Sequence, residues 1–240
     1  MKKNVLVTGG NSGIGYATAK LFSERGYAVT ISGRNASRVM DAAQTLHVEG
    51  VVADVSNYDD VVDLASRFNE TGLDVLVNNA AIARFMPLES INKADYDEFF
   101  YTNIRGPMLL MQSLLPALRK NGGSVVNISS IITNNGLPNA SLYAATKGAI
   151  EAFTKSLALE LAPQRIRVNA VSPGAVDTPL IAKLGLNEEQ IKAARSQMES
   201  TIPLSRYAKP EEIAEVVWAQ AESTYTTGAV WAVDGGVSAF

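Results

Sequence analysis

The sequence predicts an α/β fold built on one doubly wound parallel sheet of about seven strands, with helices on both faces. Short, continuously apolar runs alternate along the chain with longer amphipathic stretches. The first pattern is typical of buried parallel strands and the second of helices that cover a sheet. Right-handed crossovers then place helices on both faces. No linker or repeat divides the 240 residues, so we expect a single domain over residues 1–240.

The apolar runs predict strands at residues 5–7, 28–31, 51–53, 75–77, 125–128, 168–171 and 230–233. The amphipathic stretches predict helices at about residues 13–25, 37–46, 58–69, 93–120, 141–161 and 210–221. One long insertion breaks this alternation, with a helical stretch near residues 187–199. Long insertions in compact domains are usually lids or binding loops, so we expect a substrate lid at about residues 179–205.

Composition excludes several classes of protein. Formal net charge is −3, from 21 basic and 24 acidic residues, and no basic block is present. We therefore expect neither a nucleic-acid partner nor a membrane-surface partner. The sequence has no cysteine and one histidine, which argues against disulfides and a metal site. The first apolar run, residues 5–7, is too short for a signal peptide or a membrane span, so we expect a cytoplasmic protein.

A glycine-rich turn follows the first predicted strand and leads into a helix. Its glycines are Gly9, Gly13 and Gly15, with Asn11, Ser12 and Ile14 between them. Glycines permit a tight turn and a close approach of the backbone to a ligand. The N-terminus of the following helix offers free N–H groups to a pyrophosphate. The pattern predicts dinucleotide binding, although a plain strand-to-helix turn has the same composition.

The end of the second predicted strand indicates which dinucleotide binds. Folds of this kind place a carboxylate here to hold the free 2′-hydroxyl of NAD, or an arginine nearby to hold a 2′-phosphate. This chain has Ser32 at the position of the acid and Arg34 two residues later. A guanidinium matches phosphate geometry. We therefore expect NADP(H) to be preferred, with NAD(H) as the alternative cofactor and a solvated loop residue as the alternative role of Arg34.

Tyr143 and Lys147 are four residues apart in a predicted helix and therefore share a face. A free tyrosine titrates near pH 10 and is a weak base at neutral pH. A neighbouring ammonium favours the phenolate, so we expect Lys147 to lower the pKa of Tyr143. An amphipathic helix can carry the same pair for no catalytic reason, and the pair alone is weak support for catalysis.

Taken together, these motifs resemble those of the short-chain dehydrogenase/reductase family. The turn at residues 8–15, the Tyr-x-x-x-Lys pair, Pro173-Gly174 and the closing residues 233–236 all match in order. Residues 78–81 read Asn-Asn-Ala-Ala where the family has Asn-Asn-Ala-Gly. The resemblance covers essentially the whole chain. It implies a Rossmann-type fold and hydride transfer between a nicotinamide cofactor and a carbonyl or alcohol.

The resemblance also assigns roles to single residues. Ser130, thirteen residues before Tyr143, matches the serine that hydrogen-bonds the substrate oxygen, with Ser129 as the second candidate. Asn103 matches the asparagine that breaks the helix and anchors a water in a proton relay to the lysine, and Lys147 would also hold the nicotinamide ribose. Asp54 matches the acid that faces the adenine, although capping of the next turn is its alternative role. Further cofactor contacts are implied at Val55, Asn79, Ala80, Tyr143, Pro173, Gly174, Val176 and Thr178.

The implied function is a carbonyl reductase or alcohol dehydrogenase that acts on a small molecule. One alternative is a 3-oxoacyl-carrier-protein reductase, which needs a basic docking surface for its acidic carrier. The two positions concerned are Asn121 and Gln164, although Arg119, Lys120, Arg165 and Arg167 lie close in the sequence. A non-catalytic NADP-binding regulator is the other alternative; loss of the tyrosine or the lysine would signal it, and both are present.

A homotetramer is expected from the distribution of apolar residues. The predicted helices at residues 93–120 and 141–161 carry more apolar and small residues than one buried stripe requires. The final strand, with Trp231, and the apolar tail at residues 237–240 lie at a sheet edge, and such edges are usually covered. Assembly through these elements, as the resemblance also implies, would give two-fold interfaces.

Overall fold

The computed structural model describes residues 2–178 and 188–239 of the chain. In this part, the strands form one sheet of seven in the order β3-β2-β1-β4-β5-β6-β7, and every neighbouring pair is parallel. The predicted doubly wound fold is confirmed. The strands are β1 (Asn4–Thr8), β2 (Ala28–Gly33), β3 (Glu49–Val52), β4 (Val75–Asn78), β5 (Ser124–Ile128), β6 (Arg167–Pro173) and β7 (Val230–Val233).

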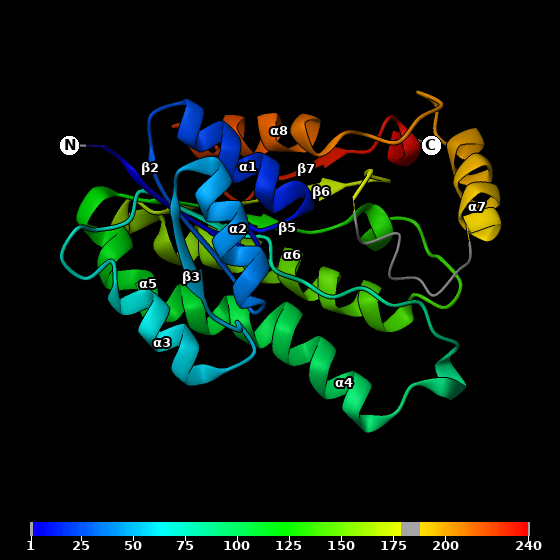
Figure 1. Ribbon diagram of the computed structural model, residues 1–240, viewed down its shortest axis with the longest axis horizontal. Helices are drawn as coiled ribbons and strands as arrows, with labels where there is room; N and C mark the ends of the chain where they lie inside the picture. The colour runs from blue at the N-terminus through cyan, green and yellow to red at the C-terminus, as the bar shows by residue number, and fades with distance from the viewer. Residues whose placement is uncertain (1, 179–187, 240) are drawn as a thin grey trace.

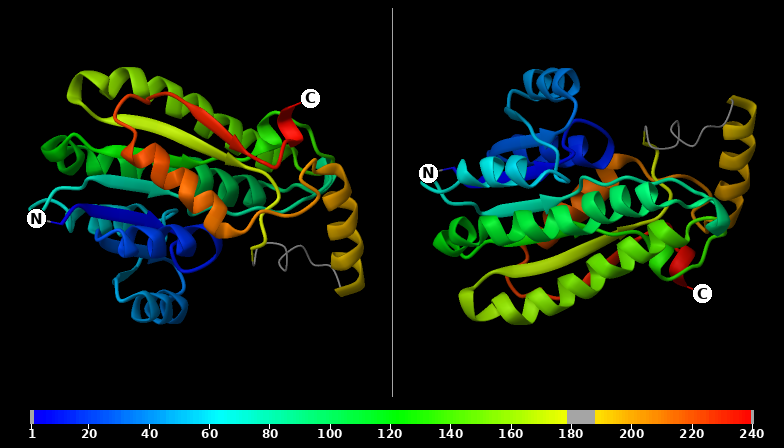
Figure 2. Two further views of the ribbon diagram at one scale, coloured as in Figure 1. Left: turned by 90° about the horizontal axis from the view of Figure 1, so that it is seen from above. Right: turned by 90° about the horizontal axis from the view of Figure 1, so that it is seen from below.

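Helices cover both faces of the sheet, as Figures 1 and 2 show. One face is covered by α1, α2 and α8, and the other by α3, α5 and α6. The helices are α1 (Gly13–Glu24), α2 (Ala36–Leu46), α3 (Tyr58–Ser66), α4 (Lys93–Phe100), α5 (Gly106–Asn121), α6 (Ser141–Leu161), α7 (Glu188–Thr201) and α8 (Pro210–Glu222). Short helical turns are η1 (Leu88–Ser90), η3 (Ile131–Thr133), η4 (Ala162–Gln164) and η6 (Val237–Ala239).

The sheet separates two apolar cores because successive side chains of a strand point to opposite faces. In β1, Leu6 belongs to the core under α3, α5 and α6, whereas Val5 and Val7 belong to the core under α1, α2 and α8. All three side chains are fully buried. This two-sided burial explains why the central strands read as continuous apolar runs in the sequence.

Most elements differ from the sequence prediction by a few residues at their ends, and two of the differences have a clear physical cause. The helix expected at residues 93–120 is interrupted by a π-helical turn, η2 (Tyr101–Arg105), between α4 and α5. The third strand begins at Glu49, two residues earlier than expected, and ends at Val52. A polar residue is tolerated there because the strand lies at the sheet edge, where the Glu49 carboxylate accepts a 3.1 Å hydrogen bond from Thr30.

The carboxyl ends of the parallel strands meet at one edge of the sheet, and α7 stands beyond that edge (Figures 1 and 2). The strand order reverses between β1 and β4, and in folds of this class ligands bind in the crevice at this switch point. Of the lid expected at residues 179–205, residues 179–187 lie outside the part that the structure describes. In the described part of the chain, no helix is both long enough and apolar enough to cross a membrane.

Candidate active site

The glycine turn follows β1 and leads directly into α1. Gly9 and Gly13 have φ values of 63° and 54°, a backbone region that other residues rarely adopt. A methyl group at Gly15 would lie 2.4 Å from the Gly9 carbonyl oxygen, so the turn closes only around a glycine. Ser12 precedes α1 without a side-chain capping bond, and the first turn has no acidic residue. The helix therefore presents N–H groups that fit a diphosphate.

Asn79 and Thr8 brace this turn across the switch point. The Asn79 side chain donates to the carbonyl oxygens of Thr8 and Gly9, at 2.9 Å and 3.2 Å. The Thr8 hydroxyl in turn accepts from the backbone N–H groups of Asn79 and Ala80, each at 3.0 Å. The amide of Asn79 thus binds the protein backbone and fixes the shape of the phosphate-binding turn. The sequence predicted a cofactor contact at Asn79 and gave no sign of this bracing.

At the end of β2, the structure distinguishes Ser32 from Arg34. Ser32 is fully buried. It pairs with Thr8 in register, two positions after the pair of Leu6 and Thr30, so its side chain points to the α3–α5 side of the sheet. Arg34 follows the strand and is exposed. Of these two predicted cofactor residues, only Arg34 therefore has a side chain that an external phosphate can reach.

Gly33 lies between Ser32 and Arg34, and the space around it has no room for a side chain. A methyl group there would lie 2.5 Å from the Asn11 side-chain oxygen, which places Asn11 of the glycine turn directly over the end of β2.

Asp54, after β3, uses one carboxylate oxygen to accept from the Ser56 N–H and hydroxyl, at 2.9 Å and 2.8 Å. This is the turn-capping role that the sequence left open for Asp54. The neighbouring Val55 is buried.

Lys147 and Tyr143 lie on successive turns of α6, at the carboxyl end of β5. Lys147 is only 4% exposed, and its ammonium donates a 2.7 Å hydrogen bond to the Ile128 carbonyl oxygen. The same nitrogen lies 5.7 Å from the centre of the Tyr143 ring. Ser130, two residues after Ile128, accepts a 3.3 Å hydrogen bond from the Ile132 N–H and lies near enough to Tyr143 to lower its pKa. The Tyr143 ring also meets Phe85 edge to face. The structure therefore brings Tyr143, Lys147 and Ser130 together as predicted.

Burial disfavours the charged forms of both α6 groups. It raises the pKa of Tyr143 to about 12, and the hydrogen bond with Ser130 opposes this shift only in part. Burial also lowers the pKa of Lys147 to about 8. The expected lowering of the Tyr143 pKa by Lys147 is not seen in the protein alone. The Lys147 ammonium points to the Ile128 carbonyl oxygen, and its proton is itself weakly held.

Asn103 lies in the π-helical turn and connects three segments of the site. It is 2% exposed. Its side-chain amide exchanges two hydrogen bonds of 2.9 Å with the backbone of Ile82 and donates one of 3.1 Å to the Thr146 hydroxyl. Thr146 in turn donates to the Tyr143 carbonyl oxygen at 2.8 Å. Sequence reasoning missed Thr146; its place between Tyr143 and Lys147 is the one signal that could have found it.

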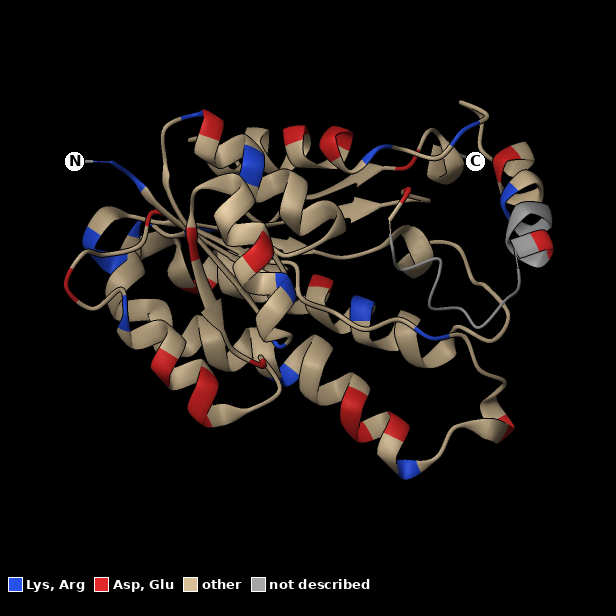
Figure 3. Cartoon of the chain, in the orientation of Figure 1, with Lys and Arg blue, Asp and Glu red and all other residues tan. Residues whose placement is uncertain are grey.

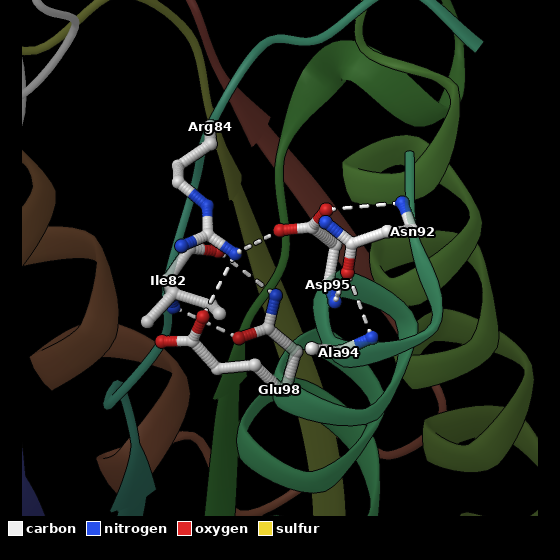
Figure 4. A network of polar contacts seen from close by, with 7 residues as sticks. Ile82, Arg84, Asn92, Ala94, Asp95 and Glu98 are labelled. Carbon is white, nitrogen blue, oxygen red and sulfur yellow. Dashed lines mark hydrogen bonds and ion pairs between the residues drawn. The ribbon is translucent and has the colours of Figure 1, made fainter. Parts of the chain in front are cut away.

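The loop at Ile82 is also held from α4. Arg84 points between the carboxylates of Asp95 and Glu98, at 3.0 Å and 2.7 Å, as Figure 4 shows. Its guanidinium also lies over the ring of Phe99, 5.3 Å from the centre. These contacts fix the segment that follows Asn79 and Ala80, so Arg84 has a structural role.

The loop after β6 completes this edge of the sheet. Gly174 passes so close to the last strand's loop that a methyl group on it would lie 2.8 Å from the Asp234 Cα. Pro173 and Val176 are buried, and Thr178 is partly exposed. Between them and α7, Asp177 receives two hydrogen bonds from Arg195, at 3.1 Å and 3.2 Å. The predicted nicotinamide-binding loop is thus joined to the described part of the predicted lid.

Among the residues that the structure describes, no group of histidine, aspartate and glutamate side chains could hold a metal ion. Figure 3 shows basic and acidic residues distributed along the chain, with acidic residues grouped on α3 and on α8. What the site does offer is a turn that fits a diphosphate and, two strands along the same edge of the sheet, the partly exposed Tyr143 with the buried Lys147.

Comparison with known proteins gives consistent matches over the whole chain. A family model described as enoyl-(acyl carrier protein) reductase matches residues 9–238. The 3-oxoacyl-[acyl-carrier-protein] reductase FabG of Thermotoga maritima is 38% identical over 98% of this chain and 97% of its own length.

Solved structures agree with these matches. The 3-ketoacyl-(acyl-carrier-protein) reductase from Brucella melitensis, complexed with NADH, superposes with a TM-score of 0.91, 32% identity and 98% coverage of both chains. A variant actinorhodin polyketide ketoreductase with NADPH gives a TM-score of 0.92 at 28% identity, over 100% of this chain and 98% of its own.

Fold, site and matches together define an oxidoreductase that interconverts a carbonyl and an alcohol. The chain belongs to the short-chain dehydrogenase/reductase family, as its motifs indicated.

The buried Lys147 predicts a pH dependence of stability. In the unfolded chain Lys147 keeps its proton up to its ordinary pKa of 10.5, whereas in the folded protein it loses it near pH 8. The folded state thus gains stability as the pH rises between these values, by about 2–3 kcal/mol from pH 7 to pH 10. Urea unfolding of wild type and Lys147→Met should show this gain in wild type only.

The exposed Lys155 on the same helix supplies the control, and Lys155→Met should follow wild type at each pH. A stability difference between wild type and Lys147→Met that stays constant from pH 7 to pH 10 would contradict the assignment.

Proposed function

We propose that this protein is an NADP(H)-dependent carbonyl reductase or alcohol dehydrogenase with Tyr143 as its general acid and base. The observation that carries the proposal is the meeting of Tyr143, Lys147 and Ser130 at the carboxyl end of β5. This is the sheet edge at which the glycine turn also lies, two strands away. A dinucleotide that extends from the turn along this edge would bring its nicotinamide to the tyrosine.

Each residue has a defined task in this mechanism. The nicotinamide cofactor, when bound, supplies or accepts the hydride. Tyr143 gives its proton to the carbonyl oxygen during reduction and takes it back during oxidation, while Ser130 polarises the same oxygen. Lys147, beside the ring, replaces the proton and holds the ribose. Asn103 keeps the relay in place through Ile82 and Thr146.

Other residues bind the cofactor in this proposal. Amides of the glycine turn and α1 would hold the diphosphate, through Asn11, Ser12, Gly13, Ile14 and Gly15. Arg34 would hold the 2′-phosphate of NADP. The loop from Pro173 to Thr178 would hold the carboxamide, and residues 188–205, the described part of the expected lid, would cover the substrate.

A small-molecule substrate is favoured over an acyl carrier protein by the placement of basic residues. Arg119 and Lys120 lie near the end of α5, Arg165 follows η4, and Arg167 begins β6, so within one chain they lie at the sheet edge opposite Ser130. Arg167 donates to the carbonyl oxygens that end α8, and Arg119 to the side chain of Gln164. Because the Thermotoga maritima relative is a 3-oxoacyl-carrier-protein reductase, that activity remains the second candidate.

An NADPH absorbance assay over a panel of ketones, alcohols and one 3-oxoacyl thioester separates these candidates. Turnover of the thioester alone would favour the carrier-dependent reductase, and turnover of no compound would favour a binding protein.

A cytoplasmic location is also part of the proposal, because a chain without cysteine has no disulfide to form.

Tyr143→Phe should abolish turnover and leave cofactor binding nearly unchanged, because only the phenol hydroxyl is lost. Fluorescence titration with NADPH checks binding, and the absorbance assay checks turnover. A purified variant that retains more than a few per cent of wild-type kcat would show that another group transfers the proton.

NADP(H) should bind more tightly than NAD(H), with Arg34 responsible, because the exposed guanidinium lies at the end of β2 beside the glycine turn. A charge-assisted hydrogen bond to phosphate contributes about 1.5–3 kcal/mol. Arg34→Ala should therefore weaken NADP(H) binding roughly 10- to 100-fold and leave NAD(H) binding unchanged. The exposed Arg38 in the first turn of α2 gives the control variant Arg38→Ala. Equal affinities in wild type would refute the assignment.

We also propose a homotetramer with two-fold axes. Large apolar side chains on α4, the π-helical turn, α5 and α6 are exposed, including Phe100, Met108 and Leu159, the last at 80%. In the edge strand β7, Trp231 is also exposed. A second copy would cover both areas. Light scattering at micromolar concentration should give four times 25.6 kDa, and an active monomer would rule the proposal out.

A further inference from the structure

One carboxylate on α6 holds the short segment that carries Ser130. Glu151 Oε1 accepts a 2.6 Å hydrogen bond from the Ser129 hydroxyl and a 2.9 Å bond from the Thr133 hydroxyl. Ser129 precedes Ser130 directly, and Thr133 follows it by three residues. The Thr133 hydroxyl also lies 3.0 Å from the Ser130 carbonyl oxygen. The segment is thus tied to the same atom on both sides of Ser130.

Glu151 lies in line with the other residues of α6 that hydrogen-bond the end of β5 and the residue after it. Tyr143, Lys147 and Glu151 are spaced by four, so they follow one another along one side of the helix. Lys147 donates to Ile128, and Glu151 accepts from Ser129, the next residue of the chain. Hydrogen bonds to a carboxylate are stronger than those between neutral groups, and Ser129 is only 2% exposed, so water competes little.

We propose that Glu151 is a positioning residue for the reaction, which holds the segment from Ser129 to Thr133 so that the Ser130 hydroxyl faces Tyr143 and the substrate oxygen. This inference rests on the proposed function of the site. It also explains which of two adjacent serines acts on the substrate. The Ser129 hydroxyl donates to Glu151, whereas Ser130 is partly exposed and lies near enough to Tyr143 to lower its pKa.

The contact between Ser130 and Tyr143 makes the inference measurable. This hydrogen bond lowers the pKa of Tyr143 against the opposing effect of burial. If the segment shifts, the phenol loses that support and its pKa rises. Alcohol oxidation needs the phenolate, so the pH at which oxidation reaches half its maximum should then move upward. A change in general packing would not move it.

The charge of Glu151 must be separated from its hydrogen bonds. Lys147 and Lys155 stand one turn before and one turn after it on α6, and Ser129 and Thr133 face it from the end of β5. Removing a negative charge lowers the pKa of a nearby phenol, which is opposite in sign to the loss of the Ser130 contact. Glu151→Gln removes the charge and keeps an oxygen that accepts both bonds. Glu151→Ala removes both.

The experiment compares wild type, Glu151→Ala, Glu151→Gln and the control Glu160→Ala, an exposed glutamate on the same helix. NADPH binding, kcat, KM and the pH profile of alcohol oxidation are measured for each. For Glu151→Ala we expect kcat to fall roughly 10- to 100-fold with NADPH affinity retained, and the half-maximal pH to rise. Glu151→Gln should recover most of kcat, and Glu160→Ala should match wild type.

Three results would overturn the inference. The first is that Glu151→Ala has the same kcat and pH profile as Glu160→Ala. The second is that Glu151→Gln loses as much kcat as Glu151→Ala. The third is that the half-maximal pH falls in both Glu151 variants. Wild type is measured in the same assay, so its inactivity would instead refute the proposed function. If Glu151→Ala does not fold, Ser129→Ala and Thr133→Val each remove one bond. Each should lower kcat and raise the half-maximal pH, and unchanged values in both would overturn the inference.

Discussion

The hydrogen bond from Lys147 to the Ile128 carbonyl oxygen is the contact on which the site depends. It joins the middle of α6 to the last residue of β5 at 2.7 Å, in surroundings that exclude water. Tyr143 is one helical turn away on one side of this contact, and Ser130 is two residues away on the other. The relative position of the three groups therefore follows from a single backbone oxygen and a single ammonium, held between two rigid elements.

This arrangement places the two ionisable groups under the same constraint. Burial favours the neutral form of Tyr143 and the neutral form of Lys147, so a phenolate beside an ammonium is the costly state in the protein alone. Hydrogen-bond donors that reach the phenol make that state accessible, and Ser130 is one such donor. Formation of the Tyr143 phenolate beside the Lys147 ammonium therefore depends on the hydrogen-bond donors around the tyrosine ring.

The sequence predicted most of the architecture, because the central strands are buried on both faces and their apolar runs have no other explanation. It also placed Tyr143, Lys147 and the glycine turn together, since the carboxyl ends of parallel strands share one edge. It could not predict which face of β2 Ser32 occupies, because a one-residue change of register reverses the direction of every side chain. Nor could it show that Asn79 braces the turn, since that contact joins residues 70 positions apart.

The residue pattern missed the start of β3 and the break after α4 for a different reason, although the resemblance gave Asn103 as a helix-breaking residue. At the sheet edge, the Glu49 carboxylate is stabilised by Thr30 and Arg67, and no local pattern reveals partners 19 and 18 residues away. In the long helix, residues 93–120 keep their helical composition through the π-helical turn. The interruption is set by the tertiary contacts of Asn103 with Ile82 and Thr146, which a periodic pattern does not contain.

That π-helical turn has a consequence for how such a site can arise. A π turn accommodates an additional residue within an otherwise regular helix, and the helix on either side keeps its direction and its exposed and buried faces. The packing of α5 against the sheet is therefore compatible with either length of the segment from Tyr101 to Arg105. A residue that contacts neighbouring segments, as Asn103 does, can be inserted into such a helix, or deleted from it, by the gain or loss of one codon, while the core beneath stays as it was.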